Sequence, residues 1–177
     1  MIITKYLSTF GLLTASVMLV FAQSKSSNLD STDRKFVTAA AAGGLAEVQL
    51  GQLAQTKGSN QAVRDFGSQM VKDHSNANDQ LKGIASNKGV AVADKMNAKD
   101  QALYDRLSKL SGSQFDRAYM DAMVRDHRED VSEFRRESRA GKDTDVKTFA
   151  SSTLPTLEHH LQMAEQAQKQ LGASSAR

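Results

Sequence analysis

Apolar side chains recur at spacings of three and four residues in four long stretches of the chain, a pattern that predicts four amphipathic helices. We expect these helices over about 33–57, 60–87, 114–140 and 144–171. Small polar residues that favour helix starts precede three of them: Ser31 or Thr32, Ser113 with Asp116 as a capping box, and Asp143 or Thr144. Four amphipathic helices of similar length typically form a four-helix bundle.

The connection between the second and third long helices is unusually long, at roughly 25 residues. It contains an extra short helix, expected over about 98–110, with Asn97 as its cap. A connection of this length permits a crossover along the bundle, as in ferritin-like topology. Alternatively, the short helix extends the third long helix beyond the end of the bundle. The predicted fold class is therefore all-α: a ferritin-like four-helix bundle with one extra short helix.

The first residues have the character of an export signal. Lys5 supplies a positive charge, residues 6–21 are largely apolar, and Val20-Phe21-Ala22 fits a cleavage site. The apolar stretch is shorter than the roughly 20 residues of a membrane span, although an uncleaved anchor is the alternative. We therefore predict a signal peptide over 1–22, a disordered linker over 23–32, a bundle domain over 33–172 and a disordered tail over 173–177. The predicted location is the periplasm.

Composition limits the partners that the chain can have. The chain contains no Cys, which excludes disulfides and a lipid-modified cysteine and suits an oxidising compartment. The formal net charge is only +3. Acidic and basic residues alternate, as over residues 125–130, which is typical of a solvated helix face rather than a nucleic-acid surface. We expect no nucleic-acid partner and no integral membrane span after removal of the signal.

One residue of metal-ligand type lies near the midpoint of the apolar face of each long helix. These residues are Glu47, His74, His127 and His160. Three of the four histidines in the chain thus occupy positions where a helix would normally place Leu, and burial of an unpaired polar group is costly. Because the midpoints of bundle helices lie level, the four side chains can converge in the core. The sequence predicts a transition-metal site, with Zn, Cu and Fe as candidate ions.

Two other interpretations of these four residues stay open. They could form a hydrogen-bonded polar network without metal, or the helices could be rotated so that the histidines face solvent. A di-iron oxygenase is excluded because Val71, Val124 and Leu157 stand where a Glu-x-x-His pattern needs glutamate. No separate acid/base pair or nucleophile accompanies the cluster, so an enzyme is the less favoured reading.

Residues next to the histidines could take part in the same site. Met70, Met123 and Met163 each lie within one helical turn of a histidine, and thioethers favour Cu(I), but methionine is also a common core residue. Asp73 and Asp126 precede two of the histidines and could orient a ring or pair with a neighbouring base.

The assembled motifs resemble an exported bacterial family catalogued as domain of unknown function 4142. The resemblance covers about Lys35 to Leu171. It depends on Ala46-Glu47, the Met-Val-x-Asp-His that ends at His74, and Phe115-Asp116 with Tyr119 leading to His127. It continues through Thr153-Leu154-Pro155 to His160. The resemblance implies export, a ferritin-like bundle and the association of Glu47 with three histidines, but no established activity. Members are often labelled outer-membrane proteins; this chain has no lipid-anchoring Cys to support that label, and an association with the outer membrane stays an open alternative.

The leading functional hypothesis is a periplasmic bundle that binds a transition metal in its core and serves metal handling or envelope stress tolerance. The first alternative is a structural or partner-binding envelope protein with a metal-free polar core. The second is a metal-dependent hydrolase or redox enzyme at the same site. Metal binding is expected to weaken below about pH 6, because imidazole must be neutral to coordinate.

Overall fold

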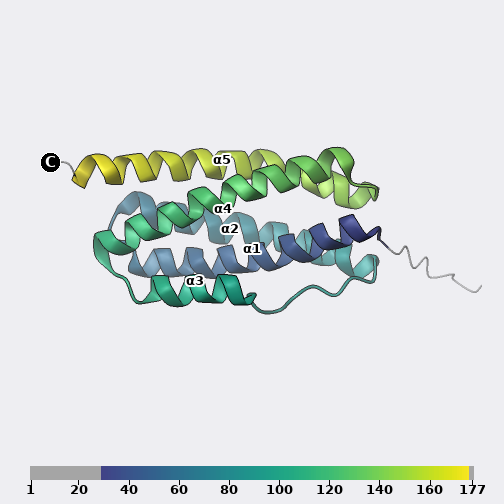
Figure 1. Cartoon of the computed structure of the whole chain (residues 1–177), viewed down its shortest axis with the longest axis horizontal. Helices are drawn as coiled ribbons and strands as arrows, with labels where there is room; N and C mark the ends of the chain where they lie inside the picture. The colour runs from purple at the N-terminus through teal and green to yellow at the C-terminus, as the bar shows by residue number, and fades with distance from the viewer. Residues whose placement is uncertain (1–28, 176–177) are drawn as a thin grey trace, which may run out of the picture.

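The computed structural model describes residues 29–175 as five helices without any strand in that range (Figure 1). They are α1 (Ser31–Lys57), α2 (Gln61–Asn87), α3 (Ala98–Ser108), α4 (Gly112–Ala140) and α5 (Thr144–Ser175). The all-α class predicted from the sequence is confirmed. The predicted signal peptide over 1–22, the linker residues 23–28 and the tail residues 176–177 lie outside the described residues.

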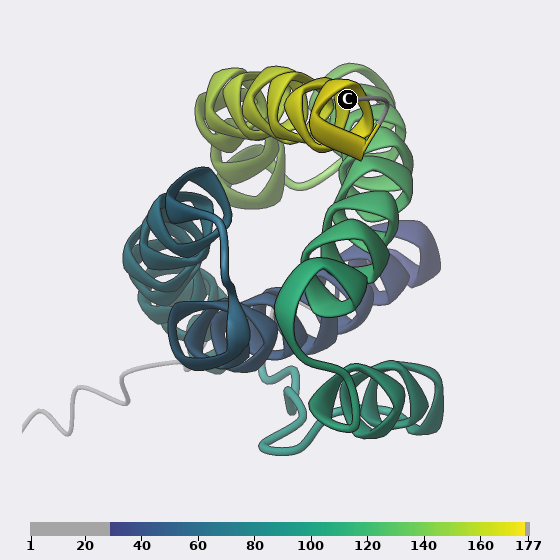
Figure 2. The same cartoon turned by 90° about the vertical axis from the view of Figure 1, so that its left-hand side faces the viewer.

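The long helices form two hairpins, α1 with α2 and α4 with α5, which pack against each other through α1–α4 and α2–α5 contacts (Figure 2). The segment from 88 to 111 joins the hairpins and runs back along the length of the bundle (Figure 1). Within it, α3 packs against α1 and α4 as a separate helix. It ends before a turn at Gly112, whose φ of 57° is in the left-handed region that favours glycine. The short helix is therefore not an extension of α4.

The predicted helix caps are confirmed for α3 and α5 and wrong for α1 and α4. Asn60 and Asn97 accept backbone N–H bonds as N-caps, and Asp143 does the same for α5. The prediction of Ser31 or Thr32 as the first cap is wrong, because Asp30 accepts the N–H of Thr32 and the helix starts at Ser31. Leu29, just before this cap, is buried in the core. Helix α5 extends to Ser175, past its predicted end at 171.

The apolar core consists of two clusters, one toward each end of the bundle. The first contains Leu50, Phe66, Met123 and Ala164; the second contains Val37, Leu81, Val131 and Leu157. On each of the four long helices, residues of one cluster lie before the central polar residue and residues of the other lie after it. The fold thus places Glu47, His74, His127 and His160 in a polar layer between two apolar ones.

A buried aspartate from each hairpin binds the turn of the other hairpin. Asp116 of α4 accepts hydrogen bonds from the N–H groups of Ser59 and Asn60 and from the Ser59 hydroxyl, in the turn between α1 and α2. The predicted capping box of Ser113 and Asp116 is therefore wrong. The carboxylate stabilises the start of α2 instead of its own helix, whose cap residue Ser111 makes no side-chain bond. Asp116 thus accepts its hydrogen bonds from residues more than fifty positions away in sequence.

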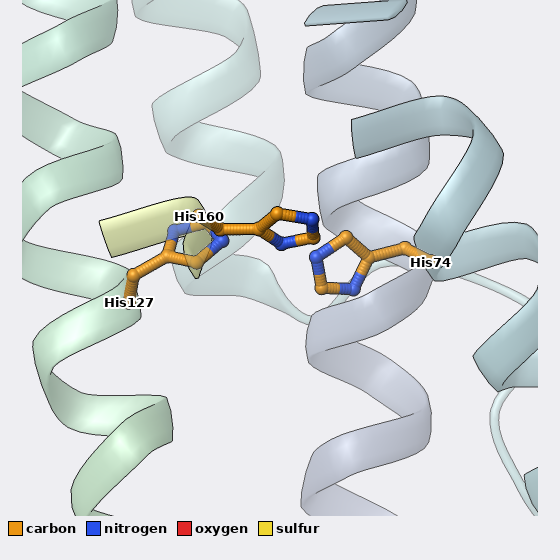
Figure 3. A group of neighbouring side chains, drawn as sticks. All are labelled: His74, His127 and His160. Carbon is orange, nitrogen blue, oxygen red and sulfur yellow. The ribbon is translucent and has the colours of Figure 1, made fainter. Parts of the chain in front are cut away.

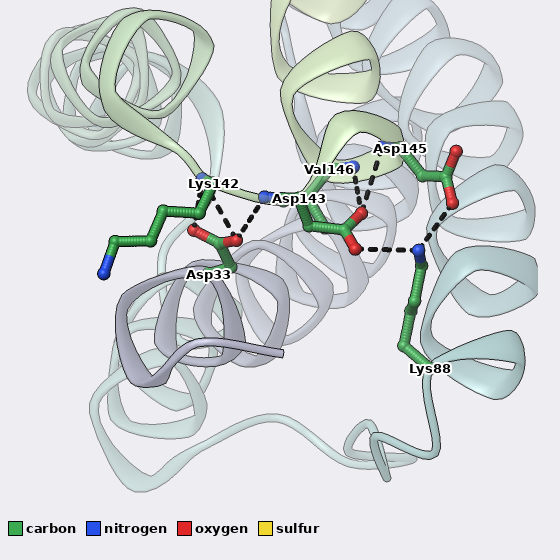
Figure 4. A network of polar contacts seen from close by, with 6 residues as sticks. All are labelled: Asp33, Lys88, Lys142, Asp143, Asp145 and Val146. Atoms are coloured by element: carbon green, nitrogen blue, oxygen red, sulfur yellow. Dashed lines mark hydrogen bonds and ion pairs between the residues drawn. The ribbon is translucent and has the colours of Figure 1, made fainter. Parts of the chain in front are cut away.

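Asp33 of α1 plays the corresponding part at the turn between α4 and α5 (Figure 4). It accepts the backbone N–H groups of Lys142 and Asp143, the latter at 2.7 Å. Lys88, at the end of α2, adds ion pairs of 2.7 Å to Asp143 and Asp145. These contacts hold the two hairpins in register, and that register sets the relative height of the four central residues.

Candidate metal centre

The structure brings together all four residues that the sequence singled out. Glu47 of α1, His74 of α2, His127 of α4 and His160 of α5 are all buried, with His127 and His160 fully so. The ring centroids of the three histidines lie 5.3 to 5.8 Å apart. Figure 3 shows the three rings pointing toward one another from their helices. The interpretation that the histidines face solvent is therefore wrong, whereas the exposed His159 is the one histidine that stays outside the cluster.

Hydrogen bonds fix which nitrogen of two rings carries a proton. His127 Nδ1 lies 3.0 Å from the Met123 carbonyl oxygen. A carbonyl can only accept, so Nδ1 donates and Nε2 of the neutral ring is left with a lone pair. His160 Nε2 lies 2.8 Å from the carboxylate of Asp73, so Nε2 donates and Nδ1 carries the lone pair.

Glu47 contacts the rings of both His74 and His127. Its Oε2 lies 2.8 Å from His74 Nδ1, and its Oε1 lies 3.2 Å from His127 Nε2. When Glu47 is ionised, His74 Nδ1 donates to it and His74 Nε2 carries the lone pair. The closer contact fixes the His74 ring. The second contact sets a carboxylate oxygen against a nitrogen lone pair, so it is favourable only with a proton or a metal ion between the two atoms.

Four buried atoms of the cluster have no hydrogen-bond partner among residues 29–175. They are Glu47 Oε1, His74 Nε2, His127 Nε2 and His160 Nδ1. One nitrogen from each of the three rings lies within 4.8 Å of the others. In proteins, a metal-binding histidine typically donates its second N–H to a carboxylate or a carbonyl, which fixes the ring for coordination. All three rings show that arrangement, with Glu47, Met123 and Asp73 as the acceptors.

The electrostatics of the cluster keep the rings neutral. Burial lowers the pKa of His74 and of His160 to about 4, and burial also lowers the pKa of His127. Burial raises the pKa of Glu47 to about 7, against the opposing effect of His127. For Asp73, burial raises the pKa, but hydrogen bonds from Gln69 and His160 outweigh it and leave the pKa below its usual value. At neutral pH the site therefore presents uncharged imidazoles, the form that coordinates metals.

A surface cavity of about 290 Å³ between α2 and α5 leads to the cluster. His74 and His160 form part of its lining, and most of the rest is polar, including Asp73, Ser152 and Thr156. The cavity reaches the side chains of His74 and His160, whose unpaired nitrogens, His74 Nε2 and His160 Nδ1, are themselves buried.

Several neighbours differ from their sequence-based interpretation. The side chains of Met70 and Met123 are fully buried in the apolar cluster, and it is the Met123 backbone that contacts His127. Asp73 does orient a ring, but that of His160 across the bundle rather than that of its neighbour. Sequence analysis missed Asp130, which lies one turn after Asp126 and near Glu47. The i, i+4 spacing of these two aspartates was the available signal.

Within residues 29–175, none of the helices combines the length and the apolarity needed to cross a membrane. A crystal structure described as a DUF305 fragment from Deinococcus radiodurans has a similar fold, with a TM-score of 0.71 and 14% sequence identity. The match covers 81% of this chain and 99% of that one. At this identity the similarity extends to the fold alone. No curated protein matches the chain. The family described as "Domain of unknown function (DUF4142)" matches residues 19–167, so the chain belongs to the DUF4142 family.

Proposed function

We propose that this protein binds one transition-metal ion in the core of a ferritin-like four-helix bundle. The ligands are His74 Nε2, His127 Nε2 and His160 Nδ1, with Glu47 Oε1 as a fourth donor. The observation that carries the proposal is the convergence of three buried ring nitrogens whose lone pairs have no hydrogen-bond donor among the described residues. Three imidazoles and a carboxylate suit Zn²⁺, Cu²⁺ or Fe²⁺.

A metal-free polar network is the less economical explanation of the same residues. Buried polar networks stabilise a protein when every member is paired, and an unpaired buried group costs about 1–3 kcal/mol. Here the outward nitrogens are paired and the inward ones are not. A network selected only to set helix register would not need the inward atoms to face one another.

The proposed role is metal handling or envelope stress tolerance in the periplasm, after removal of residues 1–22. The cavity beside His74 and His160 favours one further candidate, a metal-dependent hydrolase or redox enzyme, because it would let a small molecule reach the ion. The named side chains of that cavity give no second acid/base pair, so binding remains the preferred function.

The test is the metal content of the mature chain, purified without a His-tag and stripped with a chelator. Titration with Zn²⁺, Cu²⁺, Fe²⁺ and Ni²⁺ should show one tightly bound ion per chain for at least one metal. His160→Ala should weaken that binding by more than about 100-fold. His159→Ala is the matched control, since it removes an exposed histidine next in sequence, and it should bind like the wild type. A stoichiometry near zero for all four metals would retire the proposal.

A further inference from the structure

A second group of potential ligands shares Glu47 with the histidine cluster. Oxygen atoms of Glu47, Asp126 and Asp130 lie within 4.8 Å of one another. Asp126 and Asp130 are one turn apart on α4, on either side of His127 in sequence, and Glu47 comes from α1. Two neighbouring helices therefore direct three carboxylates at one small volume.

No lysine or arginine of the described chain is bound to these three carboxyls, and burial followed by the charge of Glu47 raises the pKa of Asp126 to about 7 and that of Asp130 well above its usual value. Within residues 29–175, neither Asp126 nor Asp130 accepts a hydrogen bond or pairs with a lysine or an arginine. The nearby Lys99 is 79% exposed and pairs with Glu129 instead, at 3.6 Å. Carboxylates brought this close repel one another unless a cation or a proton lies between them.

Glu47, which also contacts His74 and His127, links this group to the histidine cluster. Its side chain is only 2% exposed, and its Oε1 has no hydrogen-bond partner in the described chain. A small cavity of about 20 Å³ includes Glu47, His74 and Asp130 in a lining that is otherwise mostly apolar and does not include Asp126. A space of that size holds about one water-sized particle. The buried oxygen and the cavity thus mark a place for a single small occupant beside the carboxylates.

The carboxylate group has its own route to the surface. A cavity of about 390 Å³, lined by residues of α3 and α4, includes Asp126, Asp100 and Glu129 in its lining. In Figure 2, α3 lies beside α1 and α4, away from the α2–α5 pair whose cavity leads to the histidines. Lys99, Arg106 and Arg125 line the same cavity, so this approach carries charges of both signs.

We propose that Glu47, Asp126 and Asp130 bind a second cation, a hard divalent ion of the Mn²⁺ or Mg²⁺ type, with Glu47 shared between the two sites. Oxygen-only ligands suit such ions, whereas the imidazole side suits a transition metal such as Zn²⁺. The inference extends the proposed function and depends on it only through the shared Glu47. The chain would then hold a mixed two-ion centre with chemically distinct halves.

The experiment uses Mn²⁺ as the probe, in the metal-stripped mature chain at pH 7.5, with and without one equivalent of Zn²⁺. Free Mn²⁺ is followed by its electron paramagnetic resonance signal, which falls when the ion binds. The wild type should bind one Mn²⁺ in either state. The double variant Asp126→Asn with Asp130→Asn should weaken Mn²⁺ binding by at least about tenfold and keep Zn²⁺ binding. Asp121→Asn, an exposed aspartate on the same helix, is the matched control and should bind Mn²⁺ normally.

Two further variants separate this inference from the proposed function. His160→Ala should lose Zn²⁺ and keep Mn²⁺, whereas Glu47→Gln should weaken both. Thermal melting of each variant checks that it is folded. Absence of Mn²⁺ binding in the wild type, or unchanged binding in the double aspartate variant, would overturn the second site. Unchanged Mn²⁺ binding in Glu47→Gln would overturn the sharing of Glu47. If Zn²⁺ fails to bind while Mn²⁺ binding depends on the aspartates, the second site stands and the proposed function falls.

Discussion

The molecule contains two kinds of buried polar group, and they differ in how fully they are paired. At the ends of the bundle, Asp33 and Asp116 each accept several hydrogen bonds from the turn of the opposite hairpin. In the middle, three histidines and Glu47 leave four buried atoms without a hydrogen-bond partner in the described chain. The first kind makes the contacts that stabilise a fold. The second kind leaves buried atoms without a partner, as expected of groups that await a bound ligand.

The two regions depend on each other. Asp33 and Asp116 fix the hairpins relative to one another, and this register brings residues from four helices to one level. Rigid placement by hydrogen-bonded neighbours is what a metal site needs, because coordination requires ligands held at defined positions. The hydrogen-bonded aspartates at the two ends of the bundle thus hold the four central residues in position.

The largest expected effect concerns the centre. Zn²⁺ at about a thousandfold excess over its dissociation constant should raise the free energy of unfolding of the wild type by about 4 kcal/mol, because it binds only the folded chain. His160→Ala should show no such gain, while the exposed-site variant His159→Ala should show all of it. Urea unfolding with and without Zn²⁺ measures both. An equal gain in His160→Ala would place the ion elsewhere.

The next effect concerns the ends. Asp116→Ala leaves the N–H groups of Ser59 and Asn60 and the Ser59 hydroxyl without their acceptor, and should lower the free energy of unfolding by about 3 kcal/mol. Asp121→Ala, on the exposed face of the same helix, should cost less than about 0.5 kcal/mol. Denaturant unfolding of the stripped chains measures the difference. Equal stabilities would show that the saturated contacts do not support the fold.

The third prediction concerns Glu137, a buried carboxyl near Asp33 whose Oε1 has no hydrogen-bond partner in the described chain. Burial, followed by the charge of Asp33, raises the pKa of Glu137 from 4.5 to about 7. The folded chain then holds a proton that the unfolded chain has released, so this group's contribution to stability falls as pH rises from about 4.5 to above 7. Glu137→Gln should resemble the wild type at pH 5 and be more stable by about 2 kcal/mol at pH 8. A variant with the same pH profile as the wild type would refute the raised pKa.

The pH dependence of metal affinity should be set by Glu47 rather than by the histidines. Protons compete for a ligand only below its pKa, which is about 7 for Glu47 and about 4 for His74 and His160. Zn²⁺ affinity should therefore fall by about tenfold per pH unit below pH 7. This decrease begins at a higher pH than the value of about 6 expected from the histidines alone. In Glu47→Gln, affinity is weaker but should stay nearly constant down to about pH 5. Competition titrations with a chromophoric chelator measure both slopes, and identical slopes would exclude Glu47 as the competing group.

The smallest expected effect is on the stability of the metal-free centre. His127→Leu replaces a ring whose Nε2 is unpaired by an apolar side chain, and should change the free energy of unfolding by less than about 1 kcal/mol, or raise it. Metal binding should be lost at the same time. A loss of about 3 kcal/mol or more, comparable to that of Asp116→Ala, would instead indicate a structural polar network.

Local sequence patterns predicted the elements of this fold well, and long-range contacts account for what they missed. The apolar spacing located four helices, and it placed Glu47 and three histidines on their buried faces. Asn97 was predicted as a cap because a capping bond spans only two or three residues. Asp116 was misassigned because its partners lie in the turn between α1 and α2.

The same limit applies at the site. No periodicity indicates that Asp73 contacts His160 rather than its neighbour, since that choice depends on how α2 and α5 rotate against each other. For the methionines the spacing left two roles open, ligand or core residue, and the core role is the one seen for Met70 and Met123.

The central claim is that three ring nitrogens present lone pairs to one another inside the bundle. Long-range nitrogen–proton NMR of the ¹⁵N-labelled, metal-stripped chain at pH 7.5 reports directly which nitrogen of each histidine is protonated. The structure predicts protons on Nδ1 of His74 and His127 and on Nε2 of His160, with the other three nitrogens bare and shifting when Zn²⁺ is added. Protonated inward nitrogens, or inward nitrogens that do not respond to any of the four metals, would contradict the account.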